Sequence, residues 1–133
     1  IKVSPKQDFE VIVDYAHNPD SLKNVYETIE PQIRKRGSRL IAVLGATGRR
    51  DKTKRPIMGA LAGRYTDLVY VTNEDPYDED PMTIIEEVAA GVLKGKKGKW
   101  RLNKNYYKLI YGKSADPIIC HRPLPVRTPP GGV

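Results

Sequence analysis

The sequence predicts an α/β domain: a Rossmann-like, three-layer fold whose mostly parallel sheet is incomplete at its C-terminal end. Three segments with the composition of strands alternate with segments of helical periodicity, in the order β-α-β-α-β-α. This alternation is typical of parallel strands joined by right-handed helical crossovers. The chain has 133 residues, enough for one domain with its own core, and no apolar run approaches the length of a membrane helix.

The first strand and helix are predicted at residues 9–14 and from Pro19 onward. Residues 9–14 are mostly apolar and β-branched and end in an acid. Asn18 suits the N-cap, Pro19 suits the first helical position, and Gly37 suits the residue that ends the helix. Apolar residues at helical spacing define the buried face that we expect, namely Leu22, Val25, Tyr26, Ile29 and Ile33.

Two further strand–helix pairs follow. Residues 39–44 form an apolar run after one arginine, which predicts a strand buried on both faces. The second helix is expected to begin between Thr53 and Pro56, the third strand covers residues 67–72, and Pro81 opens the third helix. The expected buried faces are Ile57, Ala60, Leu61 and Tyr65 in the second helix, and Ile84, Ile85, Val88, Ala89 and Val92 in the third.

The net charge of +7 is concentrated at the C-terminal end. Residues 1–93 carry 13 Lys and Arg against 15 Asp and Glu, whereas residues 94–133 carry 10 against one. This distribution favours a solvated basic tail over a nucleic-acid-binding module, which stays open as an alternative for residues 94–108. Residues 100–110 are expected to add a strand or a short helix, and residues 111–133 to form an irregular tail rich in proline and glycine.

The cysteine and histidine content limits the chemistry. Cys120 is the only cysteine, which excludes an internal disulfide and a cysteine-based zinc cluster, and two histidines argue against a histidine-rich metal site. No signal peptide is visible at the start. We therefore expect a reducing, cytoplasmic setting and no metal site in this chain.

Three polar segments follow predicted strands, at residues 14–18, 45–55 and 73–77. In open α/β sheets, ligands bind outside the carboxyl ends of the strands, so these segments are expected to meet at one edge. The second segment combines glycines, which permit close approach of the backbone, with five cations that favour a phosphate or carboxylate. A solvated basic loop with turn glycines explains the same residues, and the segment is neither a P-loop nor a dinucleotide fingerprint.

Each polar residue in these segments has a functional and a structural interpretation. Asp14 could accept hydrogen bonds from ribose hydroxyls or cap a turn. His17 could carry a proton or support the helix start beside it. The acids after the third strand could bind an amine or Mg²⁺, or simply precede a helix; they are Glu74, Asp75, Asp78, Glu79 and Asp80.

Together these segments resemble the C-terminal domain of the Mur ligases, over about residues 8–93. Within that family they are most similar to members that add the third amino acid to UDP-N-acetylmuramoyl-dipeptide in peptidoglycan biosynthesis. Folylpolyglutamate and cyanophycin synthetases share the first motif and form the alternative ligase class, against which the second motif argues. The three motifs are Asp14-Tyr15-Ala16-His17-Asn18-Pro19-Asp20, Gly45-x-x-Gly48-x-Arg50-Asp51-x-x-Lys54-Arg55-Pro56-x-Met58-Gly59, and Asp75-Pro76 before Asp80-Pro81.

The resemblance implies an amide ligase that uses ATP and Mg²⁺ to convert a carboxylate to an acyl phosphate, which the amine of an amino acid attacks. It implies that ATP contacts Asp14, His17 and Asn18, with His17 the one candidate for a catalytic role. The implied amino-acid site comprises Arg50, Glu74, Asp75, Pro76 and Tyr77. The Mg²⁺ ligands and the nucleotide-sugar site belong, in the family, to central and N-terminal domains absent from this chain. We therefore expect no activity from the chain alone, and no membrane partner.

Two departures from the family pattern qualify this interpretation. Tyr77 stands where diaminopimelate-adding members carry an arginine, which argues against diaminopimelate and leaves lysine or another amino acid open. The family's later Gly-Lys-Gly-x-x-Glu element is missing. We therefore expect residues 1–110 to be a truncated Mur ligase C-terminal domain, and we hypothesise that residues 111–133 are read out of frame.

Overall fold

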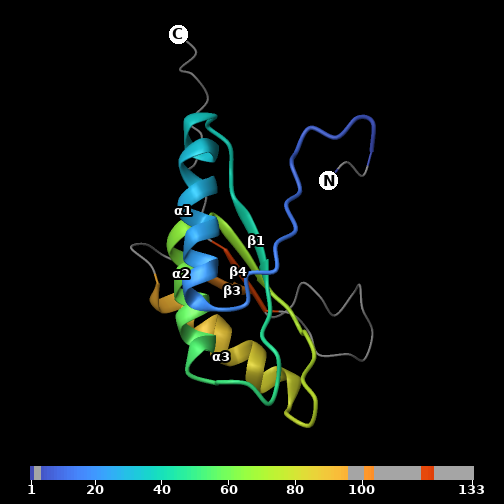
Figure 1. The fold of residues 1–133 in the computed structure, drawn as a ribbon, viewed down its shortest axis with the longest axis vertical. Helices are drawn as coiled ribbons and strands as arrows, with labels where there is room; N and C mark the ends of the chain where they lie inside the picture. Colours follow the sequence, from blue (N-terminus) through green and yellow to red (C-terminus); the bar gives the residue numbers. More distant parts are fainter. Residues whose placement is uncertain (2–3, 96–100, 104–117, 122–133) are drawn as a thin grey trace.

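The structure is a computed structural model, and it describes residues 1, 4–95, 101–103 and 118–121. The described residues form three helices and four short strands (Figure 1). In chain order they are α1 (Pro19–Lys35), β1 (Ile41–Leu44), α2 (Lys54–Tyr65), β2 (Leu68–Val71), α3 (Pro81–Lys94), β3 (Arg101–Asn103) and β4 (Ile118–His121). The α/β class and all three predicted helices are confirmed.

The four strands form one sheet in the order β1-β2-β4-β3. β1 and β2 are parallel, as expected, with Ile41 opposite Leu68. β4 runs antiparallel to both of its neighbours, so the described sheet is mixed rather than mostly parallel. The prediction missed this because β4 lies inside the segment 111–133, for which we expected no regular structure. The rest of that segment lies outside the described residues.

The strand predicted at residues 9–14 is not formed. The segment is extended but belongs to no sheet, and Phe9, Ile12 and Val13 are exposed. Its carbonyl groups are already used locally: Gln7 donates its side-chain amide to the Phe9 oxygen (2.6 Å), and the Ile1 nitrogen donates to the Val11 oxygen (2.8 Å). The Phe9 and Val11 oxygens thus accept from residues 1–7 rather than from a neighbouring strand, and the apolar pattern is not accompanied by strand pairing here.

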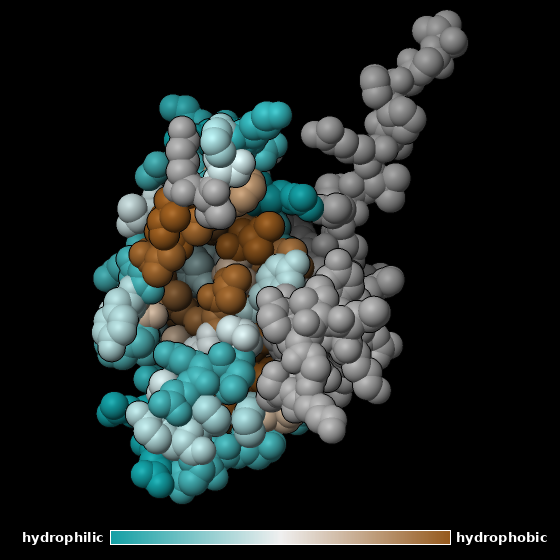
Figure 2. All heavy atoms as spheres, turned by 90° about the vertical axis from the view of Figure 1, so that its right-hand side faces the viewer, coloured by the Kyte–Doolittle hydropathy of each residue, from teal (hydrophilic) through white to brown (hydrophobic). Residues whose placement is uncertain are grey.

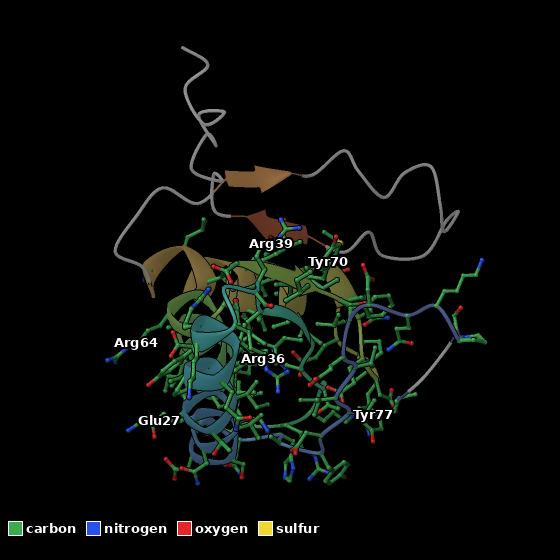
Figure 3. The ribbon with its side chains drawn as sticks, turned by 90° about the horizontal axis from the view of Figure 1, so that it is seen from above. Glu27, Arg36, Arg39, Arg64, Tyr70 and Tyr77 are labelled. Carbon is green, nitrogen blue, oxygen red and sulfur yellow. The ribbon has the colours of Figure 1, made fainter. Side chains whose placement is uncertain are left out.

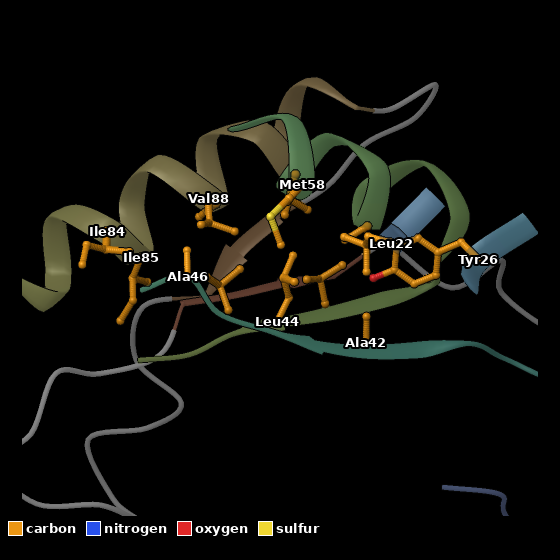
Figure 4. Packing of buried hydrophobic residues seen from close by; sticks show 14 residues of the cluster. Leu22, Tyr26, Ala42, Leu44, Ala46, Met58, Ile84, Ile85 and Val88 are labelled. Atoms are coloured by element: carbon orange, nitrogen blue, oxygen red, sulfur yellow. The ribbon is translucent and has the colours of Figure 1, made fainter. Parts of the chain in front are cut away.

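The helices cover one face of the sheet, and the core lies between them and the strands (Figure 4). Ala42 and Leu44 of β1 point into this core, whereas Ile41 and Val43 are 51% and 72% exposed. The prediction that β1 is buried on both faces is therefore wrong, and the described part of the molecule has two layers rather than three. Figure 2, which views the molecule from the right-hand side of Figure 1, shows a group of apolar side chains on that face.

The two ends of α1 follow their sequence signals. Asn18 is the N-cap, and its Oδ1 accepts from the Ser21 N–H at 2.9 Å, ahead of Pro19. Gly37, at φ +66°, takes the left-handed conformation that glycine tolerates at a helix end. Leu22 and Tyr26 anchor the helix in the core. No helix in the described residues is long and apolar enough to cross a membrane.

α2 and α3 pack more closely than the apolar pattern of α2 suggests. A methyl group on Gly91 of α3 would overlap the carbonyl oxygen of Pro56, and one on Gly59 of α2 would overlap that of Val88. The buried face of α2 is Arg55, Met58, Gly59, Ala62 and Gly63, whereas Ile57 is half exposed. The predicted face was right in part: Leu61 and Tyr65 are partly buried against the core, but the side that meets α3 is built mainly from glycine, alanine and one arginine. The stripe predicted for α3 is buried as expected.

Candidate functional site

The three polar segments meet in the structure. The start of α1, the β1–α2 loop and the β2–α3 loop lie toward the same end of the molecule (Figure 1). Lys54 donates its ammonium group to the His17 carbonyl at 3.0 Å, joining the first segment to the second. The Gly48 N–H donates to the Asp75 carbonyl at 2.8 Å, joining the second to the third. Residues far apart in the sequence thus form one connected polar surface, as predicted, although the first segment reaches it without a preceding strand.

In the first segment, backbone contacts fix the orientation of two side chains. Asp14 accepts the Ala16 N–H on Oδ1 at 2.9 Å, which is the turn geometry that the sequence left open. His17 places Nδ1 3.0 Å from the Tyr15 carbonyl. A carbonyl only accepts, so this contact requires a proton on Nδ1. Both side chains are exposed, and each keeps one polar atom directed to solvent.

The close approach of the β1–α2 and β2–α3 loops depends on Gly48. This residue is buried, and a Cβ at its position would overlap the carbonyl oxygen of Pro76. Any larger residue would push the two loops apart and break the bond from the Gly48 N–H to Asp75. A glycine at this position is therefore a requirement of the loop contact.

A buried ion-pair cluster lies beneath these loops. Arg55 is fully buried, and both of its Nη atoms bond to Glu79, at 3.0–3.1 Å. Nη1 also donates to Glu87 at 2.7 Å, and Nη2 to the Thr47 carbonyl at 3.3 Å. Burial disfavours the charged guanidinium, but the bonds to Glu87 and Glu79 outweigh it and raise the pKa of Arg55. Its Nε is the one buried side-chain polar atom without a partner among the described residues.

Glu79 also reaches the loop above it. Its Oε1 accepts the Arg49 N–H at 2.7 Å, and its Oε2 lies 3.3 Å from the Lys52 ammonium group. The Arg49 N–H and the cations around it hold the pKa of Glu79 below its usual value, although partial burial opposes them. Glu79 is therefore a charged acceptor shared by the β1–α2 loop and the start of α2.

A second, exposed pair lies at the rim. Arg49 donates from Nε to Asp78 at 2.7 Å, and its guanidinium lies 5.7 Å from the ring centre of Tyr77. Arg49 and Tyr77 both have positive φ, at 54° and 51°, a conformation uncommon for residues other than glycine. The bond to Asp78 raises the pKa of Arg49 and lowers that of Asp78. Figure 3 shows Tyr77 on the opposite side of the molecule from Arg64.

Two charged side chains of the site make no hydrogen bond or ion pair to any residue that the structure describes. Of the five cations at residues 49–55, Arg50 alone makes no hydrogen bond or ion pair to any described residue, and Glu74 is the corresponding acid in the β2–α3 loop. The remaining acids of that loop are engaged: Asp75 accepts from the Tyr77 N–H, and Asp80 caps α3 through the Thr83 N–H. The described residues contain no group of three or more acidic, histidine or cysteine side chains able to hold a metal ion.

The sequence analysis did not assign a role to the Arg55–Glu79 pair. The sequence places Arg55 among five cations that suit either an anionic ligand or a solvated loop, and Glu79 among acids that suit either an amine or Mg²⁺, or simply precede a helix. Two features of the sequence could have indicated that Arg55 is buried. It is the second residue of α2, and the glycines of the same helix, Gly59 and Gly63, allow α3 to approach closely. Only the packing of α2 against α3 shows that this arginine is enclosed.

Comparison with known proteins agrees with this geometry. Residues 2–110 match the family model described as Mur ligase, glutamate ligase domain. The chain is 46% identical over 101 residues to the UDP-N-acetylmuramoyl-L-alanyl-D-glutamate–2,6-diaminopimelate ligase of Syntrophomonas wolfei, covering 76% of this chain and 20% of that protein. It is 42% identical over 93 residues to the UDP-N-acetylmuramyl-tripeptide synthetase of Treponema denticola, covering 70% and 18%.

The chain spans about a fifth of the length of these curated relatives. The match of the family model covers most of the chain and includes all three polar segments. This chain therefore belongs to the Mur ligase family, of which it contains the glutamate ligase domain.

Proposed function

We propose that this chain is the C-terminal domain of an ATP-dependent ligase that adds the third amino acid to UDP-N-acetylmuramoyl-dipeptide in the cytoplasm. In the proposed reaction the dipeptide carboxylate attacks the γ-phosphorus of ATP, forming an acyl phosphate and releasing ADP. The amine of the amino acid then attacks the acyl carbon, and phosphate leaves. The relatives bear the names of ligases that form this class of product.

One observation supports the amino-acid site above all. Three hydrogen-bonded loops expose one cation, Arg50, and one carboxylate, Glu74, that have no partner among the described residues. A free amino acid carries one carboxylate and one ammonium group, and charge-assisted hydrogen bonds to a guanidinium and a carboxylate are the strong ones that recognise them. We assign the amino acid's carboxylate to Arg50 and its ammonium group to Glu74, with Asp75, Pro76 and Tyr77 beside them.

The first segment fits ATP in its chemistry. Asp14 has a second carboxylate oxygen for the ribose hydroxyls, and His17 has Nε2 beyond the nitrogen that contacts Tyr15. Asn18 uses its side-chain oxygen to cap α1, so only its NH₂ group is left for a ligand. We assign the Mg²⁺ ligands, as the family resemblance implies, to domains outside this chain. In this proposal the chain's own residues bind and orient substrates and exclude water when the domains close.

Tyr77 bears on which amino acid is added. An uncharged phenol that stacks under Arg49 offers no cation for the distal carboxylate of diaminopimelate. Relatives named as diaminopimelate ligases and as tripeptide synthetases match at similar identity, so identity alone does not select the amino acid. We propose lysine, or another amino acid without a distal carboxylate, as the preferred substrate.

The experiment is a ligase assay on a chimera. The segment of the Syntrophomonas wolfei ligase that matches this chain is replaced by the residues of this chain, and ADP release is measured with UDP-N-acetylmuramoyl-dipeptide and either lysine or diaminopimelate. We expect turnover only when ATP, UDP-N-acetylmuramoyl-dipeptide and an amino acid are all present, and we expect a higher kcat/KM for lysine than for diaminopimelate. The 133-residue chain alone is expected to release no ADP. A folded chimera that releases none, while the parent ligase does, would contradict the function.

The nucleic-acid alternative depends on basic residues that mostly lie outside the described part of the chain. Nothing in the described structure favours it. Two results together would favour nucleic-acid binding over the ligase. The full chain would bind RNA in a salt-dependent way that is lost when residues 94–133 are deleted, and the chimera would lack ligase activity.

A further inference from the structure

We propose that the Arg55–Glu79 pair is a positioning device: it locks the β1–α2 loop against the β2–α3 loop and so sets the spacing between Arg50 and Glu74. The proposed consequence for amino-acid binding rests on the proposed function. The locking of the loops does not, and it can be measured separately.

The geometry of the pair is unusually restrictive. Two Nη atoms of Arg55 meet two oxygens of Glu79, so the planar guanidinium fixes the orientation of the carboxylate as well as its distance. Arg55 sits in the first turn of α2 and Glu79 in the loop before α3. The pair therefore joins the starts of two helices, and each of those helices follows one of the site loops.

Both partners also reach the backbone of the first site loop. Arg55 donates to the Thr47 carbonyl, and Glu79 accepts from the Arg49 N–H. These contacts fall on either side of Gly48, whose N–H bonds to Asp75. Residues 47–49 are thus held at three successive positions, and Arg50 is the next residue along the chain. On the other side, Asp75 lies next to Glu74.

A purely structural role would be served as well by apolar residues. Replacing a complete buried ion pair by well-packed apolar groups is often neutral or stabilising, so the charges are not required for stability as such. What apolar groups cannot supply is direction, because dispersion contacts do not fix the rotation of a loop backbone. The contacts of Glu79 with the Arg49 N–H, the Lys52 ammonium and Arg55 are directional, and all three converge on one carboxylate.

Glu87 provides the matched control. Its carboxylate also bonds to Arg55, at 2.7 Å, but it lies on α3 and makes no contact with either site loop in the described structure. Glu87→Gln therefore removes one charge from the same guanidinium, whereas Glu79→Gln removes one charge and loosens the loops. Any difference between the two variants reports the contacts to the loops.

The first measurement is amide hydrogen exchange on the full chain. If Glu79 locks the loops, Glu79→Gln should speed exchange at the Gly48 and Arg49 amides at least about tenfold, and Glu87→Gln should change it less than about twofold. Glu79→Asp keeps the charge on a shorter stem and replaces Glu79→Gln if that variant does not fold. Equal effects of the two substitutions, or unchanged exchange at Gly48, would overturn the proposal.

The second measurement uses the ligase chimera. Glu79→Gln should raise the KM for the amino acid about tenfold, with a much smaller change in the KM for ATP, and Glu87→Gln should leave both nearly unchanged. A merely structural role would lower kcat in both variants without this split, and that result would overturn the positioning role. If the unsubstituted chimera has no activity, the proposed function fails, and hydrogen exchange alone decides the locking of the loops.

Discussion

The α2–α3 helix pair and the loops that precede it use similar residues in opposite ways. At the helix pair, Gly91 and Arg55 are enclosed, with a backbone against one and carboxylates around the other. In the loops, Arg50 is exposed and unpaired among the described residues, only five positions from Arg55 in the chain. The comparison separates two roles: enclosed polar and small residues hold the frame, and exposed ones are free for a ligand.

The largest effect is expected from Gly91→Ala. Helix propensity alone predicts that this change stabilises α3 by about 1 kcal/mol. The structure predicts the reverse, because the new methyl group would overlap the carbonyl oxygen of Pro56, and backbone cannot move aside cheaply. We expect the free energy of unfolding to fall by about 3–5 kcal/mol, measured by urea denaturation of the full chain.

Gly37→Ala is the control, since a methyl group there meets no atom within 4 Å and only the positive φ opposes it. It should cost about 1 kcal/mol. Equal losses from the two substitutions would show that α2 and α3 do not pack as closely as described, and would remove the contrast between frame and loops.

The next effect is that of Arg55→Met. The methionine fills part of the buried volume but leaves Glu79 and Glu87 facing each other without the guanidinium between them. Breaking a buried ion pair from one side costs more than removing both partners, so we expect a loss of about 3 kcal/mol. The triple substitution of Arg55→Met with Glu79→Leu and Glu87→Leu should recover much of this stability. A triple variant less stable than Arg55→Met would contradict the interpretation.

The sequence predicted those parts of the fold whose causes are local. Asn18 and Pro19 mark the start of α1, and the apolar stripe of α3 needs only helical spacing. Prediction from the sequence failed where the local structure depends on residues that are distant in the chain. At residues 9–14 the apolar pattern finds no strand to pair with among the described residues, and Arg55 is buried because α3 closes over it. For the site, the strand order predicted that the loops meet, but which cations are already paired depends on packing.

Acid pH should produce a smaller, graded effect through Glu79. Its pKa in the folded chain lies below the ordinary value of 4.5, so its contribution to stability is complete above about pH 5 and is lost as the pH falls through the folded pKa. The difference in unfolding free energy between the unsubstituted chain and Glu79→Gln should therefore narrow from pH 6 to about pH 3. Thermal melts across this range measure it, and a constant difference would mean that the folded carboxylate gains nothing from its partners.

The smallest effect on stability, and the sharpest on function, is expected from Arg50→Gln. Because the Arg50 guanidinium has no partner among the described residues, the full chain should lose less than about 0.5 kcal/mol of unfolding free energy. In the ligase chimera the same change should raise the KM for the amino acid at least about tenfold, since one charge-assisted contact to its carboxylate is lost. Arg64→Gln is the control: it also removes an exposed arginine, one whose guanidinium lies 5.4 Å from the ring centre of Tyr65, on the opposite side of the molecule from Tyr77. If the two variants have the same KM for the amino acid, Arg50 does not bind the substrate. The contrast between enclosed residues that hold the fold and exposed residues that bind a ligand would then not apply to this site.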